Sequence, residues 1–248
     1  MKAIQNYLDS TYLKTAQQAQ LSESENTKVV QSVVLEAIQE GFKLVMIRPD
    51  QVSFAKSLVQ DAASNLLVGT VIDFPQGTGS LQEKLSEAQQ AINNGADELD
   101  FVVNYEAFKN GAVDAVKEEV YQCTRLGLEH HKVVKFIIEV AALSDDQIIQ
   151  LTSLIKQCVV THFKESEFQK VFVKSSTGFF VTQNQLPNGA TSHTISLMLE
   201  NAYPLPVKAA GGVRTQQEAI EMIKLGVMRI GTSSAKSIAA GFIADSDY

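Results

Sequence analysis

Two lysines lie where lysine is unusual, within short runs of apolar and β-branched residues that are typical of buried strands. Lys174 lies in VFVKSS (171–176), and Lys208 lies in PVKAA (206–210). An ammonium in such a place must find a partner, reach water or lose its proton. A lysine that is neutral near physiological pH is a nucleophile toward carbonyl carbons. The pattern therefore predicts a Schiff-base lysine at Lys174 and, at Lys208, a neighbouring cation that lowers the pKa of Lys174.

Asp100, in the run ELDFVV (98–103), is the candidate for moving protons beside that amine. A carboxylate next to an amine and a water can carry the protons that imine formation and carbon–carbon cleavage require. The structural alternative is an ion pair with Lys208 or Lys135. The two roles are compatible, because a group that relays protons also needs a hydrogen-bonding partner.

Further polar residues are expected to support this site. Lys135 lies in the run VVKFIIE (133–139), and we expect Glu139 to be its partner in a structural or relay role. Asp9 and Thr11 lie near the N-terminus and can join the same network, although an aspartate there can equally cap a turn.

Glycines and hydroxyl residues that suit a phosphate follow the last two apolar runs. AAGGVRT (209–215) offers bare backbone amides, and RIGTSSA (229–235) offers amides and hydroxyls just before a helix. Such loops build phosphate sites in parallel barrels, although turn geometry is the more frequent reason for any one glycine. Together they predict a phosphate site formed by Gly211, Gly212, Gly231, Ser233 and Ser234.

These side chains must be positioned by short apolar runs that alternate with amphipathic stretches. Strands are expected at 43–47, 66–72, 98–103, 133–139, 171–176, 206–210 and 228–232, and residues 6–13 can supply one more. Capping-box pairs, which open helices, lie between the runs: Ser22 with Glu25, Ser80 with Glu83, Ser144 with Gln147, and Thr215 with Glu218.

Near-continuous apolar strands separated by helices indicate a parallel sheet that is covered on both faces. An open doubly wound sheet and a closed barrel both fit. No G-x-G-x-x-G follows the first run, and polar residues at strand ends are what a barrel active site uses. We therefore predict an α/β protein, a single TIM (β/α)8 barrel domain over residues 1–248 with a flexible tail at about 241–248.

The composition favours a small-molecule enzyme over a binder of nucleic acid or membranes. The 248 residues are 45% hydrophobic, with no linker-like segment, and the formal charge of -7 with a pI near 5.2 lacks a basic footprint. No run is long and apolar enough for a signal peptide or a membrane span, which predicts a cytoplasmic location. The oligomeric state is left open by these patterns, and a homo-oligomer is compatible with them.

Several motifs resemble, in order and spacing, those of the 2-deoxyribose-5-phosphate aldolase family: LDSTYLK, GTVIDFPQG, EAQQAINNGADELDFVVN, KFIIEVAAL, VKSSTGF, VKAAGGVRT and RIGTSSA. They extend over nearly the whole chain. The resemblance implies a class I aldolase on a TIM barrel that reversibly cleaves 2-deoxy-D-ribose 5-phosphate to acetaldehyde and D-glyceraldehyde 3-phosphate in deoxyribose phosphate catabolism. Its partners would be phosphorylated sugars and aldehydes, and it would need no metal or organic cofactor.

The same resemblance implies roles for individual residues. Lys174 matches the Schiff-base lysine, Lys208 the lysine that lowers its pKa, and Asp100 the proton-relay aspartate. The residues that match the supporting polar network are Asp9, Thr11, Lys135 and Thr177. Those that match the phosphate site are Gly178, Gly211, Gly212, Gly231, Ser233 and Ser234.

Two positions qualify the resemblance. Phe179 stands where some relatives carry a phosphate-binding lysine, so the phosphate is expected to rely on backbone amides and serines. Tyr248, the last residue, matches a tyrosine that in some relatives reaches the active site from a flexible tail and assists proton exchange. A frayed terminus with no such role is the alternative for Tyr248.

Two other classes of function stay open at this stage. A different phosphate-binding barrel, such as a Schiff-base aldolase for another sugar phosphate or a sugar-phosphate isomerase, would share the fold and the phosphate loops. A non-catalytic barrel that serves as a binding or scaffold protein would not need Lys174, Lys208 and Asp100 together.

Overall fold

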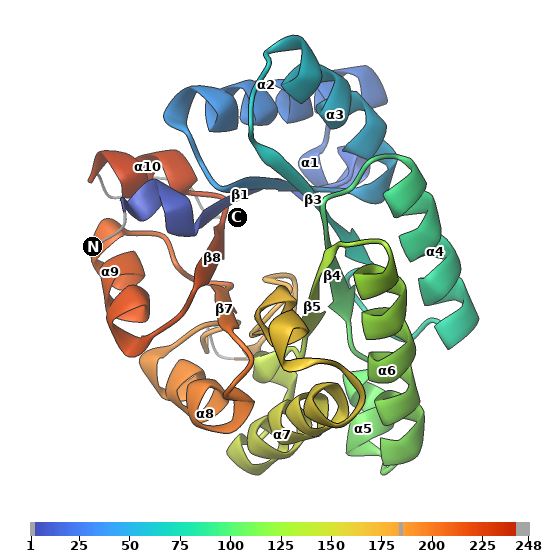
Figure 1. The fold of residues 1–248 in the computed structure, drawn as a ribbon. Coiled ribbons are helices and arrows are strands. Elements are labelled where there is room, and N and C mark those ends of the chain that lie inside the picture. Colours follow the sequence, from blue (N-terminus) through green and yellow to red (C-terminus); the bar gives the residue numbers. More distant parts are fainter. Residues whose placement is uncertain (1–2, 184–185, 242–248) are drawn as a thin grey trace.

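The centre of the molecule is a closed barrel of eight parallel strands that follow one another in chain order (Figure 1). The computed structural model describes residues 3–183 and 186–241. The predicted fold class, a TIM (β/α)8 barrel, is confirmed. The strands are β1 (Leu8–Thr11), β2 (Leu44–Ile47), β3 (Leu67–Ile72), β4 (Glu98–Val102), β5 (Val133–Ile137), β6 (Val171–Lys174), β7 (Val207–Ala210) and β8 (Arg229–Thr232).

Each strand lies within a predicted run, but β1, β4, β5 and β6 end before their runs do, and the ends of β5 and β6 bear on the site. β5 ends at Ile137 because Glu139 has a left-handed backbone with φ 56°, which breaks the extended conformation. β6 ends at Lys174, so Ser175 and Ser176 begin the following loop instead of extending the strand. Both early ends lie beside Lys174 and shape its surroundings.

Helices surround the barrel and begin where capping residues predicted them. The four predicted capping boxes are present, at Ser22, Ser80, Ser144 and Thr215. In each, the side chain accepts from the third amide of the helix, which satisfies a donor that the helix itself leaves free. Among the described residues the α-helices are α1 (Ala16–Ala19), α2 (Glu23–Glu40), α3 (Val52–Asp61), α4 (Leu81–Asn93), α5 (Tyr105–Lys109), α6 (Val113–Glu129), α7 (Asp145–His162), α8 (Ser192–Ala202), α9 (Gln216–Leu225) and α10 (Ala235–Ala240).

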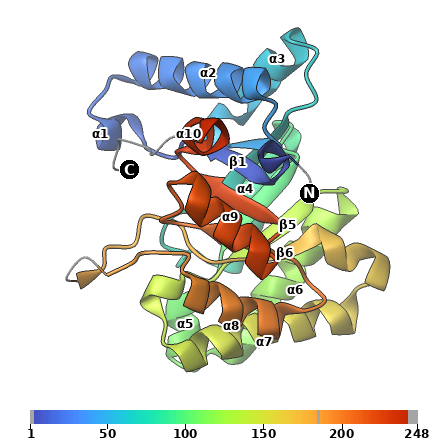
Figure 2. The same cartoon turned by 90° about the vertical axis from the view of Figure 1, so that its left-hand side faces the viewer.

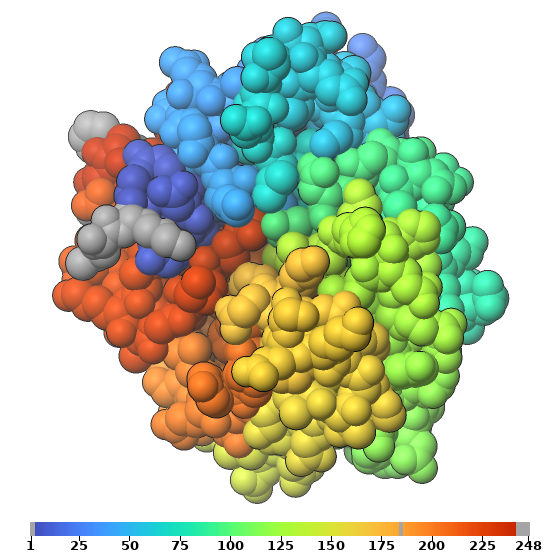
Figure 3. Space-filling view, viewed as in Figure 1, coloured from blue at the N-terminus to red at the C-terminus, as the bar shows by residue number. Residues whose placement is uncertain are grey.

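Short 3-10 helices complete the described part of the chain: η1 (Ile4–Tyr7), η2 (Pro49–Gln51), η3 (Val140–Ala142) and η4 (Glu165–Lys170). The face of the barrel seen in Figure 1 is closed by packed side chains, and the gold segment that contains η4 lies over its middle (Figure 3). In Figure 2 the segment that follows β6 extends to one side of the barrel, and η1 lies toward the opposite side.

Alternation along the strands divides the core into two layers. On β2, Val45 and Ile47 belong to the large cluster between barrel and helices, whereas Leu44 and Met46 belong to a small cluster with Val71 in the barrel interior. A Cβ on Gly69 of β3 would lie 2.8 Å from Met46 Cε, so glycine at position 69 makes room for that methionine. One side of the interior is therefore apolar, and the rest is charged.

Within the described residues, no helix combines the length and the apolar composition that crossing a membrane requires.

Candidate active site

Acidic and basic side chains from β1, β4, β5, β6, β7 and β8 fill the remainder of the barrel interior. They are joined by hydrogen bonds and ion pairs into one network, called here the interior network: Asp9, Glu98, Asp100, Lys135, Lys174, Lys208 and Arg229. All are buried, with Lys174 3% exposed. Strand register explains the assembly, because Asp100 pairs with Lys135, and Lys208 pairs with both Lys174 and Arg229 on neighbouring strands.

Asp100 is the centre of the network. Its Oδ2 accepts from Lys174 Nζ at 2.9 Å and from Lys208 Nζ at 3.0 Å, and its Oδ1 accepts from Lys135 Nζ at 2.6 Å. Burial alone would raise the pKa of Asp100, but the ammonium groups of Lys135, Lys174 and Lys208 outweigh it and hold that pKa well below its usual value. Asp100 is therefore an ionised carboxylate shared by three lysines.

Lys174 differs from the other cations in its partners and in its access to a cavity. Burial lowers the pKa of Lys174 to about 8, the carboxylate of Asp100 opposes that shift, and the charges of Lys208 and Lys135 add to it. The sequence hypothesis named partial desolvation and the charge of Lys208 together as causes of this lowered pKa. In the structure desolvation is the larger cause, and Lys208 is the first of the like charges that reinforce it.

Lys208 is held by a second carboxylate. Its Nζ lies 2.6 Å from Asp9 Oδ2, and burial, which raises the pKa of Asp9, is outweighed by Arg229 and Lys208, so the pKa of Asp9 falls below its usual value. A Cβ on Gly231 would lie 3.1 Å from Lys208 Cε. Gly231, predicted as a phosphate ligand, therefore also leaves room for the Lys208 side chain.

Sequence reasoning missed two members of the network, Glu98 and Arg229. Arg229 donates to Asp9 Oδ1 at 2.8 Å through Nε and to Glu98 Oε1 at 3.0 Å through Nη1. Glu98 also contacts Lys135 Nζ at 2.6 Å. A signal for both was available, because Glu98 lies two positions before Asp100 on one strand face, and Arg229 opens the last apolar run.

The expected pairing of Lys135 with Glu139 is wrong. Lys135 contacts Asp100 and Glu98 instead, and these two carboxylates raise the pKa of Lys135 despite its burial. Glu139 accepts from the hydroxyl and the amide of Thr177. The left-handed backbone at Glu139 takes its side chain out of the strand alternation on which the expectation rested.

The balance of charge singles out one amine. Among the described residues, the interior network contains four basic side chains (Lys135, Lys174, Lys208 and Arg229) and three carboxylates (Asp9, Glu98 and Asp100). With one cation in excess in a buried place, loss of a single proton is the least costly relief. Lys174, the amine with the lowered pKa, is the group that can supply this proton.

A pocket opens above Lys174 at the carboxyl ends of the strands, where barrel active sites lie. Its volume is about 600 Å³, including space open to solvent. The pocket is lined by Thr11, Leu13, Lys174, Thr177, Gly178, Phe179, Asn188, Ala210, Gly211, Gly212, Val213, Arg214, Gly231, Thr232 and Ser233. Its residues come from β1 and from the ends of β6, β7 and β8 with the loops that follow them.

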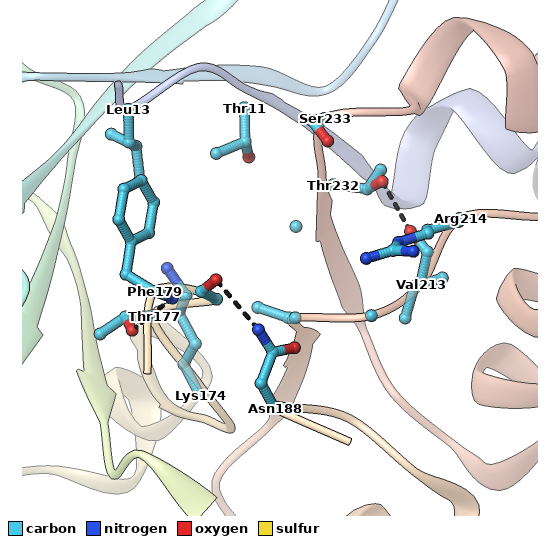
Figure 4. Close-up of a pocket in the computed structure, with 15 residues that line it drawn as sticks. Thr11, Leu13, Lys174, Thr177, Phe179, Asn188, Val213, Arg214, Thr232 and Ser233 are labelled. Atoms are coloured by element: carbon cyan, nitrogen blue, oxygen red, sulfur yellow. Dashed lines mark hydrogen bonds between the residues drawn. The ribbon is translucent and has the colours of Figure 1, made fainter. Parts of the chain in front are cut away.

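The two sides of the pocket differ in chemistry (Figure 4). Leu13 and Phe179 lie on one side, and the Phe179 ring packs edge-on against Phe74 with ring centres 5.0 Å apart. Arg214 and Ser233 lie across from them, and the Lys174 side chain lies next to Phe179 and Thr177. The apolar side suits carbon atoms, whereas the opposite side offers a cation and a hydroxyl to an anion.

Most of the predicted phosphate residues are brought together. Gly178, Gly211, Gly212, Gly231 and Ser233 all line the pocket. Ser234 is not among the lining residues; it is buried, and its amide donates to Thr232 Oγ1 at 3.0 Å.

Sequence reasoning missed Asn188 and Arg214. Asn188 lies between β6 and α8, and its side chain donates to the carbonyl of Gly178 at 3.2 Å. No sequence motif pointed to this residue. Arg214 was visible in AAGGVRT, directly after the glycines. Gly189 is required beside them, because a Cβ there would lie 2.4 Å from the carbonyl oxygen of Gly211.

The supporting residues lie close by. Thr11 lines the pocket and its hydroxyl donates to the carbonyl of Asp9 at 2.9 Å. Thr177 lines it too, and its Oγ1 accepts from the amide of Phe179 at 3.0 Å. Tyr248, the remaining candidate, lies outside the described residues.

A parallel (β/α)8 barrel with a buried amine of lowered pKa beneath a pocket at the carboxyl ends of its strands is the class of protein that the fold and the site define. Comparison with known proteins adds the family. The chain belongs to the DeoC/LacD aldolase family, whose model matches residues 7–244.

Individual relatives are similar over most of their length. The chain is 38% identical over 207 residues to a deoxyribose-phosphate aldolase of Thermococcus gammatolerans, covering 83% of this chain and 85% of the relative. It is 36% identical over 245 residues to deoxyribose-phosphate aldolase 1 of Staphylococcus aureus, covering 98% and 99%. Among solved structures, the tetrameric deoxyribose phosphate aldolase from Aeropyrum pernix matches with a TM-score of 0.77 at 28% identity, over 96% of this chain and 89% of that one. The resemblance predicted from the motifs is confirmed.

Proposed function

We propose that the protein is a class I aldolase that reversibly cleaves 2-deoxy-D-ribose 5-phosphate to acetaldehyde and D-glyceraldehyde 3-phosphate. The observation that carries the proposal is Lys174, a buried amine whose pKa is lowered to about 8, at the floor of a pocket with an anion-binding side. The names of the similar proteins support the choice of substrate.

The chemistry begins with the neutral amine. Lys174 Nζ attacks the aldehyde carbon of the open-chain sugar, and loss of water from the resulting carbinolamine leaves a protonated imine. The imine accepts the electron pair of the bond between the second and third carbons when that bond breaks. The hydroxyl on the third carbon loses its proton, glyceraldehyde 3-phosphate leaves, and an enamine of acetaldehyde stays on Lys174. Protonation of the enamine and addition of water then release acetaldehyde and restore the amine.

Asp100 and Lys208 assist by holding charge beside the reacting nitrogen. Asp100 Oδ2 contacts both Lys174 Nζ and Lys208 Nζ, so the carboxylate stabilises the positive imine and aligns the two nitrogens. Because the pKa of Asp100 is held well below its usual value, Asp100 stays ionised. Its part in the relay is therefore to orient protons on its neighbours, while Lys208 serves as the proton-bearing partner.

The phosphate is assigned to the side of the pocket across from Phe179. Arg214 supplies a guanidinium there and Ser233 a hydroxyl, and the loop glycines Gly211 and Gly212 also line the pocket. Phe179 occupies the position of a phosphate-binding lysine in some relatives, and its ring is engaged with Phe74. Arg214 is positioned to compensate for that missing cation.

Borohydride trapping tests the proposal. The protein is incubated with 2-deoxyribose 5-phosphate or with acetaldehyde, reduced with borohydride and mapped by peptide mass spectrometry. We expect a reduced adduct on Lys174 that is absent from Lys174→Leu. Lys236→Leu, which changes an exposed lysine paired with Glu36, is the matched control and should retain the adduct. A folded protein that binds the sugar phosphate yet forms no lysine adduct would overturn the Schiff-base mechanism.

A further inference from the structure

Glu139, the second residue after β5, has an unusual backbone conformation, with φ 56° and ψ 67°. A non-glycine residue in the left-handed region persists only where its surroundings hold it, and such residues concentrate at functional sites. Glu139 is also only 1% exposed, although an ionisable side chain is costly to bury. Both features call for contacts that account for them.

The hydrogen bonds between β5 and β6 show why Glu139 has this conformation. The amide of Ile138 donates to Lys174 O at 3.0 Å, and the amide of Val140 donates to Ser175 O at 2.9 Å. The carbonyls belong to successive residues of the segment after β6, whereas the amides are two residues apart in the segment after β5. Glu139 is the extra residue, as in a β-bulge, and bulges re-aim side chains next to active sites.

The re-aimed side chain holds the loop after β6. Glu139 Oε2 accepts from the amide of Thr177 at 3.2 Å and also from the Thr177 hydroxyl. The same hydroxyl oxygen accepts from the amide of Phe179 at 3.0 Å. One carboxylate oxygen therefore fixes Thr177 at two points and, through Thr177, the backbone of Phe179.

The loop held in this way forms part of the pocket. Thr177, Gly178 and Phe179 all line it, and Gly178 lies between the two residues that the carboxylate fixes. Gly178 O in turn accepts from Asn188 Nδ2 at 3.2 Å, and the Cα of Gly211 lies 3.8 Å from the position of a Cβ on Gly178. A displacement of Thr177 would therefore reach the glycines assigned to the phosphate.

Glu139 shows no ion pair with the reacting amine in the described structure. Burial raises the pKa of Glu139, and the hydrogen bonds from Thr177, the polar side chain of Ser176 and the charge of Lys174 oppose that shift. Tyr105 also faces it, since the charge of Glu139 adds to the burial that raises the pKa of Tyr105. Glu139 Oε1 is buried without a hydrogen-bond partner among the described residues. A proton on Oε1 would leave Oε2 as an acceptor, so the contacts with Thr177 do not depend on ionisation.

We propose that Glu139 is a positioning residue that sets the phosphate-binding end of the pocket through Thr177 and Gly178, without direct contact with the Schiff-base amine. The inference rests on the proposed function, since it divides substrate binding into an amine end and a phosphate end. It predicts that loss of Glu139 weakens recognition of a phosphorylated substrate and spares imine formation by an aldehyde that has no phosphate.

The test compares two readouts in the same variants: KM for 2-deoxyribose 5-phosphate, and the rate of borohydride trapping with acetaldehyde alone. For Glu139→Ala we expect KM to rise about tenfold or more, because misplacement of binding groups by an ångström is costly, while trapping stays within about twofold. Glu139→Gln keeps an acceptor for Thr177 and should restore KM to within about threefold of the unmodified chain. If Glu139→Ala does not fold, Glu139→Asp, which shortens the reach to Thr177, should show the same selective rise.

Glu25→Ala is the control, because Glu25 also accepts from a backbone amide, that of Ser22 at 2.8 Å, and does not line the pocket. Its ratio of the two readouts should equal that of the unmodified chain. The positioning role would be overturned if KM were unchanged in the Glu139 variants. It would also be overturned if the rate of trapping fell by the same factor as KM rose. Absence of trapping in the unmodified chain would instead overturn the proposed function, so the two failures are distinguishable.

Discussion

Two buried lysines in this barrel have opposite surroundings. Lys84, on α4, and Lys174, on β6, are 0% and 3% exposed. Lys84 Nζ lies 2.7 Å from Val102 O, 3.0 Å from Gly77 O, 2.9 Å from Glu119 Oε1 and 3.4 Å from Asp73 Oδ2. Two carboxylates and two carbonyls thus surround a single ammonium.

Lys174 has the reverse balance. Its Nζ contacts Asp100 Oδ2 at 2.9 Å, and that oxygen also accepts from Lys208. The pKa of Lys174 falls to about 8 through burial, with Lys208 and Lys135 adding to the shift. Burial of a lysine is therefore not a sign of catalysis by itself. A buried lysine surrounded by more oxygen acceptors than ammonium groups keeps its proton and has a structural role. A buried lysine that shares its acceptor with other ammonium groups and faces a cavity is a candidate nucleophile.

The Lys84 cluster also has a use, which is to hold the loop after β3. Lys84 joins Gly77 in that loop to Val102 at the end of β4. Asp73, which begins the loop, accepts from the amide of Gly79 at 2.8 Å. The same loop carries Phe74, whose ring packs against Phe179 at the pocket. One lysine thus serves the architecture near the site, and the other is the one to which we assign the chemistry.

The largest expected difference between Lys84 and Lys174 is in how much the removal of each amine lowers the free energy of unfolding. Lys84→Met leaves the buried carboxylate of Glu119 and the partly buried carboxylate of Asp73 without their cation, and we expect the free energy of unfolding to fall by about 3–5 kcal/mol. Lys174→Met should cost less than about 1 kcal/mol, because it removes the excess cation of the interior network and leaves Asp100 with two lysines. Urea unfolding measures both, and equal losses would contradict the distinction. Borohydride adducts should persist in Lys84→Met and vanish in Lys174→Met.

The pH dependence of imine formation sharpens the comparison. The amine reacts when neutral, so trapping by the unmodified chain should rise with pH to a midpoint near 8 and fall about tenfold per unit below it. Lys208→Met removes a cation that lowers the pKa of Lys174. The midpoint should therefore move to higher pH, and trapping at pH 7 should slow by about threefold or more. An unchanged midpoint, or one at lower pH, would show that Lys208 does not perturb Lys174; Lys236→Met controls for loss of a surface charge.

The smallest expected effect comes from the far side of the interior network. Glu98 contacts Lys135 and Arg229 but shows no contact with Lys174. Glu98→Gln increases the excess of cations, so the pKa of Lys174 should fall further and trapping at pH 7 should rise by about twofold. Glu119→Gln, which belongs to the Lys84 cluster, should leave the midpoint where it is. A midpoint that moves to higher pH in Glu98→Gln would contradict the account of charge balance.

Several parts of the fold and site could be predicted because their signals are local. Each capping box lies within four residues, and each strand is a short apolar run, so the order of strands and helices follows from neighbouring residues. Lys174, Lys208 and Asp100 stood out because a charge within an apolar run is costly unless it is paired. Two lysines and an aspartate in such runs indicated a reaction in which a lysine amine attacks a carbonyl carbon.

Other parts could not be predicted, because they depend on residues that are distant in the chain. Glu139 was assigned to Lys135 by strand alternation, and a bulge of one residue sends it to Thr177 instead. Asn188 carries no motif and reaches the pocket through a close approach of Gly189 to Gly211. Ser234 stands beside Ser233 in sequence, yet only Ser233 lines the pocket.

The sequence by itself determined the class of fold and the family, and it indicated the residues that we propose form and stabilise an imine, since all of these depend on residue type and local spacing. Only the tertiary structure decided which of the buried lysines has too few acceptors, because that balance depends on how the closed barrel places the charges of β1, β4, β5, β6, β7 and β8 in one interior. Coulomb energies and desolvation act through space, so a pKa belongs to a position in the fold and not to a position in the chain.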